Sequence, residues 1–550
     1  MVGGGASGAA TAREAALRGF STALIEKDDF GAGTSAHCFK VVHGGIRYLQ
    51  HADIRRLRAS CRERSVFLAL APHLVSPLPF VIPTYGQGRH SKWFLGAGMK
   101  VYDFLSADCN RLVRDPARRV ARTRFFGRGE TLSLFPNIES AGLTGAAAFE
   151  DGQMYNPPRL VWAFAAAAAE RGAAIANHVA AQKLLIRDKK VSGVSATDLL
   201  TGDRFDIRAR MVINASGPWA EGLRDSGALP RHAAGAYSRD TCFAIARKPA
   251  HRMALAVQGK AKDTDAVLAR GARHLFIVPW RDITLVGVWH RVVPRAPDEV
   301  QLPQEELRSF IAEINAVYPT LGIRESEVCI SGFGLVPFGD ESHQSEGGLS
   351  FGKQSRLVDH ATTDGLSGLI TSISVRYTVA RMDAVAALDL ASRHLSGGAC
   401  NGHDHGSETQ PLPGGDIEDF AGLERELMAR RIEWLPAAGR SQLARNYGTQ
   451  LSQILALAER EPSLQQLLPG SSISLAEVAH GVREEMAITM ADVAFRRTEL
   501  GTAGHPGDAA LDALQAFMTR ELNWNAARAT AERSAVQAHL QRYLAMPRPP

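Results

Sequence analysis

The sequence contains few cysteines and no long hydrophobic run. Its six cysteines form no CxxC pair and lie far apart, which excludes a disulfide scaffold and a zinc ribbon and is typical of a reducing compartment. No stretch of about 18 apolar residues is present to span a membrane, and glycines begin at residue 3, where a signal peptide would carry its charged and apolar regions. We therefore expect a cytoplasmic protein, with any membrane contact peripheral and on the cytoplasmic face of the inner membrane.

The chain also lacks a strong excess of charge. Lys and Arg total 63 against 57 Asp and Glu, a net charge of +6, which suits an anionic substrate or anionic lipid and does not indicate nucleic acid. Hydrophobic residues make up 45% and charged residues 22%, so disorder throughout and fibrous architectures are excluded. A chain of 550 residues is too long for one core and should divide into several domains.

The hydrophobic pattern changes along the chain. It predicts a helix over 9–18, strands over 22–26, 183–186 and 211–214, and further strands over 275–280 and 283–288. Residues 395–415 have the composition of a linker, and long helical patterns follow, such as 475–496 and 509–544. The sequence therefore predicts a mixed α/β part followed by an all-helical part.

The first residues carry a nucleotide-binding motif. Gly3, Gly5 and Gly8 fit GxGxxG, a helix follows, and Glu26 ends the next strand 18 residues beyond Gly8. In such a motif the glycines allow a tight turn and close approach to a pyrophosphate, and the acid accepts from a ribose hydroxyl. An isolated GxGxxG also occurs in ordinary loops, but this placement favours a dinucleotide. Only residues 1–2 precede the glycines, so the initial strand is expected to be missing.

Longer motifs carry a family resemblance. The turn at 213–220 (INASGPWA) resembles that of FAD-dependent oxidoreductases of the D-amino-acid oxidase and glycerol-3-phosphate dehydrogenase superfamily. Residues 33–49 (GTSAHCFKVVHGGIRYL) resemble the GTSS…K-x-x-HGG-x-RYL segment of the aerobic, FAD-dependent glycerol-3-phosphate dehydrogenases. The likeness continues at 71–75, 77–80, 276–280, 355–356, 375–381, 412–416, 483–485 and 492–498, and so extends over almost the whole chain.

The resemblance implies a fold. It is an α/β fold in which a Rossmann-type FAD-binding domain has an inserted antiparallel-sheet substrate domain and is followed by an all-α C-terminal cap domain. The expected boundaries are 1–75, 151–235 and 346–395 for the FAD-binding domain, 76–150 and 236–345 for the insertion and substrate domain, 396–415 for the linker, and 416–550 for the cap.

The resemblance also implies an activity. It is the FAD-dependent oxidation of sn-glycerol 3-phosphate to dihydroxyacetone phosphate by hydride transfer to flavin, with quinone as the electron acceptor. A related phosphorylated polyol or hydroxy acid as substrate is one alternative, an amine or amino-acid oxidase another, and a flavin-free remnant kept for protein contacts a third. A homodimer is left open. No metal site is expected, because Cys400, His403 and His405 lie in the linker and are interpreted as solvated polar residues.

Two groups of site residues follow. The residues expected to bind FAD are Gly3, Gly5, Gly8, Glu26, Lys27, Thr34, Ser35, Lys40, His43, Gly44, Gly45, Val179, Ser216, Gly217, Trp219 and Val375. The residues expected at the substrate are Arg47, Tyr48, His251, His290, Arg376 and Thr378.

Their side chains suggest their roles. Arg47 and Tyr48 can anchor a phosphate, although a surface arginine beside a core tyrosine is the alternative. Arg376 stands where the family usually has lysine and supplies fixed positive charge, unless it forms a structural ion pair. Either His251 or His290 can accept the hydroxyl proton, although a single histidine is more often structural.

Departures from the family pattern affect the substrate site. Val336 stands where the family has an arginine, and residues 287–290 (GVWH) replace Gly-Thr-Thr-Asp. Either the phosphate has fewer cationic partners, or Trp289 and His290 fill part of its volume. The substrate site is therefore expected to differ from that of the family.

Overall fold

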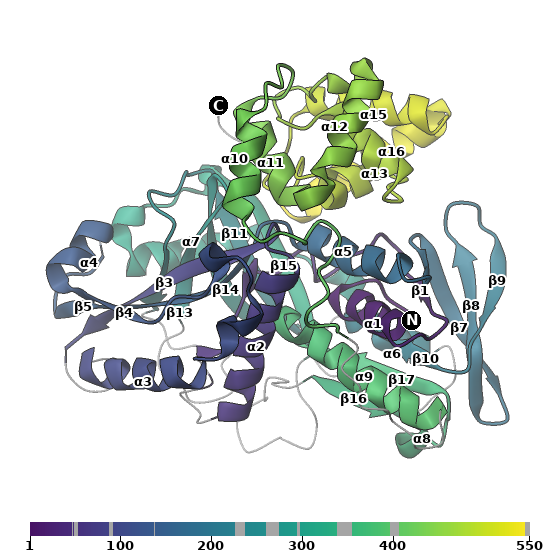
Figure 1. The fold of residues 1–550 in the computed structure, drawn as a ribbon, viewed down its shortest axis with the longest axis horizontal. Coiled ribbons are helices and arrows are strands. Elements are labelled where there is room, and N and C mark those ends of the chain that lie inside the picture. The colour runs from purple at the N-terminus through teal and green to yellow at the C-terminus, as the bar shows by residue number, and fades with distance from the viewer. Residues whose placement is uncertain are drawn as a thin grey trace.

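The computed structural model describes residues 1–46, 48, 53–86, 92–136, 138–225, 237–259, 274–293, 297–337, 355–395 and 406–544. Three parts meet at the centre of the molecule (Figure 1). They are an α/β part that contains the N-terminus, a large sheet beside it, and a helical C-terminal part that lies over both. The predicted fold class is confirmed.

The α/β part has a mostly parallel sheet, with β16 antiparallel to its neighbour. β1 (Ala23–Ile25) pairs with β6 (Ala174–Ala176), and β10 (Val212–Asn214) pairs with β17 (Leu369–Ile373), which also pairs with β16 (Arg356–Asp359). Val2 forms parallel bridges to both Ile25 and Asn214. The two residues before the glycines therefore lie at the centre of the sheet and connect its two halves.

Helices cover this sheet. α1 (Ala6–Leu17) is rich in alanine and packs against α5 (Pro157–Ala169) and α9 (Ala380–Leu395). α1 begins three residues earlier than the sequence pattern indicates, directly after Gly5. A separate antiparallel sheet of β7 (Val179–Arg187), β8 (Lys190–Asp198) and β9 (Arg204–Arg208) projects from this part (Figure 1).

The second part is a nine-stranded, mostly antiparallel sheet. Its strands are β2 (Val41–Val42), β3 (Val75–Tyr85), β4 (Arg124–Gly127), β5 (Leu143–Met154), β11 (Tyr237–Ile245), β12 (Ala254–Gln258), β13 (His274–Trp280), β14 (Ile283–Val293) and β15 (Val328–Pro337). Both predicted strands of residues 275–288 are confirmed. α7 (Gln304–Val317) covers one face, where Phe310 stacks on Trp289 with ring centroids 4.5 Å apart. α2 (Ile54–Leu70), α3 (Lys92–Leu105), α4 (Arg128–Leu134), α6 (Ala220–Asp225) and α8 (His360–Thr363) complete these two parts.

The C-terminal part is helical, as predicted. It contains α10 (Phe420–Ala429), α11 (Ala437–Tyr447), α12 (Leu451–Arg460), α13 (Leu475–Arg483), α14 (Met490–Asp492), α15 (Asp508–Glu521) and α16 (Ala526–Arg542). The helical pattern over 475–496 forms more than one helix, because α13 ends at Arg483 and Thr489 starts a new helix with its own capping box. The pattern over 509–544 likewise divides, at Asn523 with φ 51° and Asn525 as an N-cap.

The part of the chain that the structure describes includes no helix that combines the length and the apolar character needed to cross a membrane.

Candidate functional site

The glycine loop lies against the turn at 215–217. Gly3 has φ 97°, and a Cβ there would lie 2.7 Å from the Cα of Ser216. A Cβ on Gly8 would collide with the carbonyl oxygen of Gly3, so the third glycine is needed for the helix to approach the strand. The loop brings the start of α1 next to the Ser216 turn, as the sequence predicts for a dinucleotide site.

The N-terminus of α1 is open to an anion. Its N-cap is Gly5, which has no side chain, and its first turn contains no acidic residue. The N–H of Ala6 donates to Oγ of Ser35 at 3.0 Å. Helix N–H groups together with this hydroxyl fit the pyrophosphate of a dinucleotide.

The ribose side is organised around Glu26. Its Oε2 accepts from the N–H of Gly4 at 2.5 Å, and its backbone oxygen accepts from the N–H of Val179 at 2.8 Å. Burial raises the pKa of Glu26, against the opposing effect of its backbone hydrogen bonds. Beside it, the ammonium of Lys27 lies 4.5 Å from the ring centroid of Trp219, close to Gly217. These residues, all expected to bind FAD, therefore lie together.

Two predicted flavin contacts are occupied by protein partners. Lys40 has φ 62°, and its Nζ donates to the carbonyl oxygens of Ala36 and Cys38, both at 2.9 Å. The hydroxyl of Thr34 accepts from the N–H of Leu335 at 3.2 Å. These two residues fix the shape of the loop after Gly33 and attach it to β15.

His43, Gly44 and Gly45 follow β2 and are held by a buried carboxylate. Asp151 Oδ1 accepts from the N–H of Gly44 at 2.6 Å, and its Oδ2 lies 3.3 Å from His43 Nδ1. Burial disfavours the charge, but His43, Arg64 and the Gly44 N–H together hold the pKa of Asp151 below its ordinary value. The His43 side chain is 53% exposed while Asp151 is 3% exposed. The imidazole is thus fixed at one nitrogen and accessible elsewhere.

The loop also requires a glycine at position 44, because buried side chains pack directly against its backbone. A Cβ there would lie 2.6 Å from the hydroxyl oxygen of Tyr102 and would also collide with Arg64. Arg64 is buried and donates to Asp151 at 3.2 Å and to Tyr102 at 2.8 Å. Gly44 therefore allows close packing against this buried network.

Arg376 and Tyr48, both expected at the substrate, lie in contact with each other. Arg376 Nη1 donates to the hydroxyl oxygens of Tyr48 at 3.0 Å and Ser60 at 2.9 Å, and its guanidinium lies over the Tyr48 ring. Thr378 is buried, and its Oγ1 accepts from the N–H of His43 at 3.1 Å. Val375, which precedes Arg376, is partly buried. Arg47, the predicted second anchor, lies outside the described residues, as do Cys400, His403 and His405.

His251 lies in a different environment. Its Nε2 is 3.0 Å from the carbonyl oxygen of Leu134, and its Nδ1 accepts from the N–H of Met253 at 3.3 Å. The edge of its ring packs on Phe135. With Nε2 as the donor, no lone pair of His251 is left for a substrate proton.

His290 and Trp289 point to opposite faces of the large sheet. His290 Nδ1 lies 2.7 Å from Asp240 Oδ1 on the neighbouring strand. Trp289 is fully buried against α7, where its Nε1 donates to Glu313 at 3.0 Å. Trp289 therefore does not fill a volume on the face of His290.

Sequence reasoning missed Asp151, Arg64 and Ser60. One signal was available for the first of them: residues 146–151 (AAAFED) place a carboxylate within an apolar strand, and a buried carboxylate needs a partner. Ser60 and Arg64 are one turn apart on α2, a helix of mixed composition with no local motif.

The residues present fit FAD. The open helix N-terminus, Ser35 and Glu26 suit the pyrophosphate and ribose, and the turn at Ser216 packs against the glycine loop. The His43 loop then continues toward Arg376 through Thr378. The chain from Ser35 to His43 thus connects the α1 N-terminus with the segment of Arg376.

Comparison with known proteins agrees with this geometry. Residues 1–380 match the FAD dependent oxidoreductase family, and residues 406–529 match the C-terminal domain of alpha-glycerophosphate oxidase. A glycerol-3-phosphate dehydrogenase of Synechocystis sp. is 31% identical over 540 residues, which cover 95% of this chain and 92% of that protein. A mitochondrial glycerol-3-phosphate dehydrogenase of Mus musculus is 28% identical, with 97% and 71% covered.

The fold is also found among solved structures. The glycerol-3-phosphate dehydrogenase from Bacillus halodurans complexed with FAD superposes with a TM-score of 0.74 at 21% identity, covering 99% of this chain and 94% of that one. An L-proline dehydrogenase from P. horikoshii superposes with a TM-score of 0.51 at 15% identity over 72% of this chain and 93% of that one. Both family models and the near full-length relatives lead to one conclusion: this chain belongs to the FAD-dependent glycerol-3-phosphate dehydrogenase family.

Proposed function

We propose that this chain oxidises sn-glycerol 3-phosphate to dihydroxyacetone phosphate and passes the electrons to quinone. Family membership supports the reaction. The single structural observation that carries the proposal is the His43 imidazole, oriented by Asp151 and joined through Thr378 to the segment of Arg376. A proton acceptor and a cation for phosphate thus belong to one continuous loop cluster.

Arg376 is suited to bind the phosphate. Its hydrogen bonds go to two hydroxyl groups, and no salt bridge to it occurs within the described ranges of the chain. Its Nε is buried without a hydrogen-bond partner there. A guanidinium whose charge is not neutralised by a carboxylate at contact distance remains available to an anion.

His43 is suited to accept the hydroxyl proton. Asp151 is a charged acceptor, so Nδ1 carries the proton and donates to it, which leaves the lone pair on Nε2. FAD, when bound, accepts the hydride. His290, paired with Asp240, is the second candidate for the base, and Asp240 can hold its tautomer in the same way.

The electron acceptor and a membrane contact belong to this proposal too. On α3, Phe104 is 80% exposed and Val101 is 47% exposed, three residues apart on one face. Exposed apolar side chains on a helix that also presents Lys100 suit an anionic lipid surface, from which a quinone can be reached. Vesicles of phosphatidylglycerol should sediment the wild type and release a Phe104→Glu variant. We also predict a homodimer, and light scattering in solution would measure its molar mass.

A substrate panel tests the reaction. Purified holoenzyme with an artificial dye acceptor should oxidise glycerol 3-phosphate with a higher kcat/KM than glycerol, other phosphorylated polyols, phosphorylated hydroxy acids, glycine or proline. Preference for a phosphorylated hydroxy acid would identify the first rival, and turnover of an amino acid with none of glycerol 3-phosphate would identify the oxidase.

A further inference from the structure

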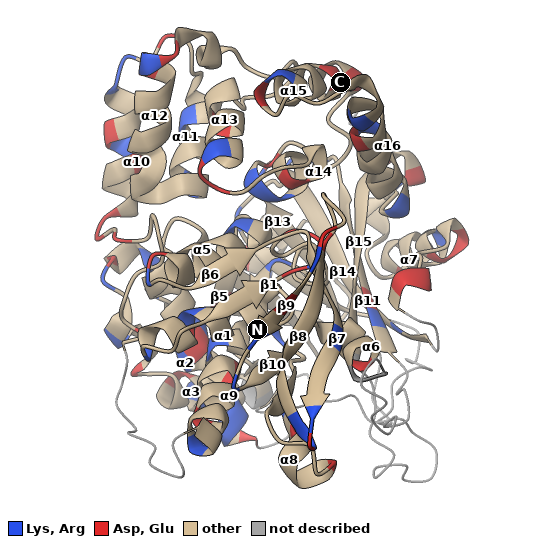
Figure 2. Ribbon diagram, turned by 90° about the vertical axis from the view of Figure 1, so that its right-hand side faces the viewer, with Lys and Arg blue, Asp and Glu red and all other residues tan. Residues whose placement is uncertain are grey.

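We propose that the C-terminal helical domain positions the adenosine half of the FAD site. It does so through the loop 26–31, which follows β1, and through His178, which precedes β7. The inference rests on FAD binding in the proposed function and adds a role for the C-terminal domain. Figure 2 shows basic and acidic segments meeting beside α13 and α14 at this boundary.

The loop 26–31 has two faces. On one, Glu26 accepts from the N–H of Gly4 at 2.5 Å, and Gly31 donates to the carbonyl oxygen of Gly4 at 2.9 Å. On the other, Asp29 is fully buried. A shift of Asp29 should therefore move both the glycine loop and the carboxylate of Glu26, which is predicted to bind the ribose.

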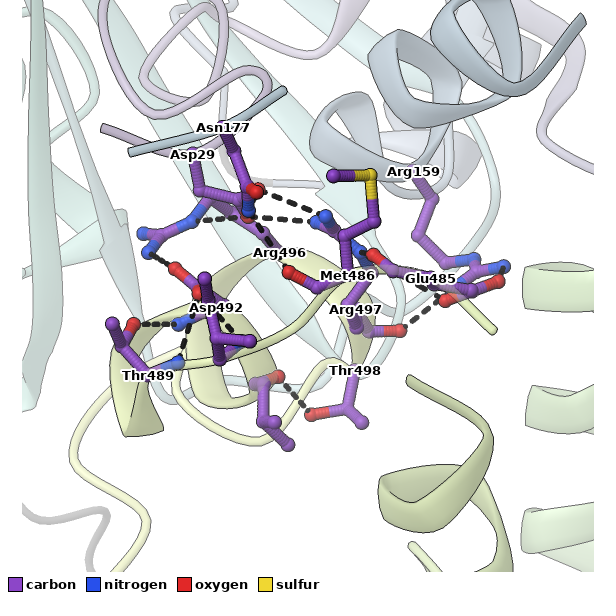
Figure 3. A network of polar contacts seen from close by, with 12 residues as sticks. Asp29, Arg159, Asn177, Glu485, Met486, Thr489, Asp492, Arg496, Arg497 and Thr498 are labelled. Atoms are coloured by element: carbon purple, nitrogen blue, oxygen red, sulfur yellow. Dashed lines mark hydrogen bonds and ion pairs between the residues drawn. The ribbon is translucent and has the colours of Figure 1, made fainter. Parts of the chain in front are cut away.

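Asp29 is bound by the C-terminal domain (Figure 3). Arg497 donates to both carboxylate oxygens, at 2.7 and 2.8 Å, and Arg496 Nε donates at 2.9 Å. Asn177 adds a fourth donor at 2.9 Å. Arg497 is itself fully buried, with its guanidinium 4.5 Å from the ring centroid of Trp162. A bidentate buried pair of this kind fixes geometry, and losing either partner leaves an uncompensated charge.

A second link reaches the adenine side. His178 Nε2 lies 3.0 Å from Asp492 Oδ2, and Asp492 Oδ1 accepts from Arg496 at 2.6 Å. His178 has φ 55° and directly precedes Val179, whose N–H donates to the carbonyl oxygen of Glu26. The segments of Glu26 and Val179, both expected to bind FAD, are therefore connected to one cluster of the C-terminal domain.

This link carries a titratable group. Asp492 and Arg496 face His178 from the C-terminal domain, Glu532 faces it from α16, and Asp29 faces it from the loop. Burial opposes the imidazolium, but the hydrogen bond to Asp492 prevails and raises the pKa of His178. The contact is thus strongest with the imidazole charged.

The test compares two single contacts between the C-terminal domain and the rest of the chain. His178→Asn keeps a residue that tolerates positive φ and removes the contact with Asp492. Tyr155→Phe is the matched control, because it removes a hydrogen bond of similar length, 2.9 Å to Glu499, at the end of β5 and away from the loop 26–31. The measurements are the rate of FAD release from holoenzyme, the Kd for FAD, the Kd for ADP as a probe of the adenosine half, and Tm.

We expect His178→Asn to raise the Kd for both FAD and ADP about tenfold, while KM for glycerol 3-phosphate at saturating FAD stays within about twofold. Tyr155→Phe should leave both Kd values within about twofold, whatever its Tm. Arg497→Lys keeps the charge but cannot bind both oxygens of Asp29 at once, so it should raise both Kd values as His178→Asn does. If it does not fold, His178→Asn alone decides.

Two results would overturn the inference: equal loss of FAD affinity in His178→Asn and Tyr155→Phe, or an unchanged Kd for ADP in His178→Asn. Failure of the proposed function looks different. In that case the wild type holds FAD without oxidising glycerol 3-phosphate, and the Kd comparison can still be made.

Discussion

Substituting Asp151 by Asn changes the tautomer of His43 with little change in shape. In the wild type, Asp151 Oδ1 accepts from the Gly44 N–H at 2.6 Å and from Arg64 at 3.2 Å, and the amide oxygen of an asparagine can still accept both hydrogen bonds. The amide nitrogen then takes the place of Asp151 Oδ2, which lies 3.3 Å from His43 Nδ1 in the wild type. Nδ1 must accept instead of donate, so the proton moves to Nε2 and the lone pair for the substrate is lost.

The size of the effect follows from these contacts. A general base in the wrong tautomer should lower kcat by about 10²- to 10⁴-fold. Because the side chains of Arg64 and Asp151 are 1% and 3% exposed, removal of the charge should also cost about 3 to 5 kcal/mol of stability. Steady-state kinetics with a dye acceptor and thermal melting of the holoenzyme measure the two effects.

Glu63→Gln is the matched control. Glu63 lies on α2 next to Arg64 and forms a buried ion pair with Arg381, with side-chain exposures of 2% and 7%. This variant should lose comparable stability and keep kcat within about threefold, since a buried pair costs stability in either place. Equal losses of kcat in both variants, or a normal kcat in Asp151→Asn, would refute the role of Asp151 in orienting His43.

Four further outcomes are expected. Arg376→Ala should raise KM for glycerol 3-phosphate by about 30-fold or more, because a charge-assisted phosphate contact is lost; steady-state curves measure this, and an unchanged KM would place Arg376 outside the pocket. Since the pKa of His178 is raised in the folded protein, its stabilising contact is complete below pH 6.5 and is lost as pH rises through the raised value; FAD release should therefore accelerate toward alkaline pH in the wild type and have a flatter pH profile in His178→Asn. Gly44→Ala should lower Tm, because the new methyl collides with Tyr102; an unchanged Tm would mean that the loop can relax. Val336→Arg should lower KM for glycerol 3-phosphate if the phosphate lies nearby, by roughly 1.5 to 3 kcal/mol of binding; a loss of Tm with no gain in KM would mean that the arginine is buried without a partner.

Sequence patterns could indicate the nucleotide end of the candidate site because its geometry is local. GxGxxG, a helix and an acid at the end of the next strand follow one another within 26 residues, and backbone geometry alone brings them together. Family motifs indicated Tyr48 and Arg376 separately as substrate-site residues, but the contact between them was not predicted. His43, the base proposed here, was not singled out from the sequence, because its difference from His251 depends on tertiary contacts: a buried carboxylate for His43 and a backbone carbonyl for His251.

Other features depend on contacts distant in sequence. Asp29 and Arg497 are 468 residues apart and form the link between the first and last domains. The helical pattern over 475–496 is continuous in sequence, yet the chain breaks it to present Glu485 to Arg159 of α5 and Asp492 to His178. Periodicity reports the buried face of a helix, but not where a buried charge in another domain interrupts it.

The two departures from the family pattern lie on opposite faces of the large sheet and therefore have different consequences. Side chains alternate along β14 and β15, so Trp289 joins the core under α7, and Leu335 does the same. Val336 therefore faces the side of Gly334, where a Cβ would lie 2.7 Å from Thr34. The tryptophan is a packing change on the far face of the sheet, whereas the valine removes a cation on the face of the FAD loop. Under the proposed function we therefore expect that, of the two, only position 336 affects how the substrate phosphate is held, and that Arg376 supplies the charge that an arginine there would have shared.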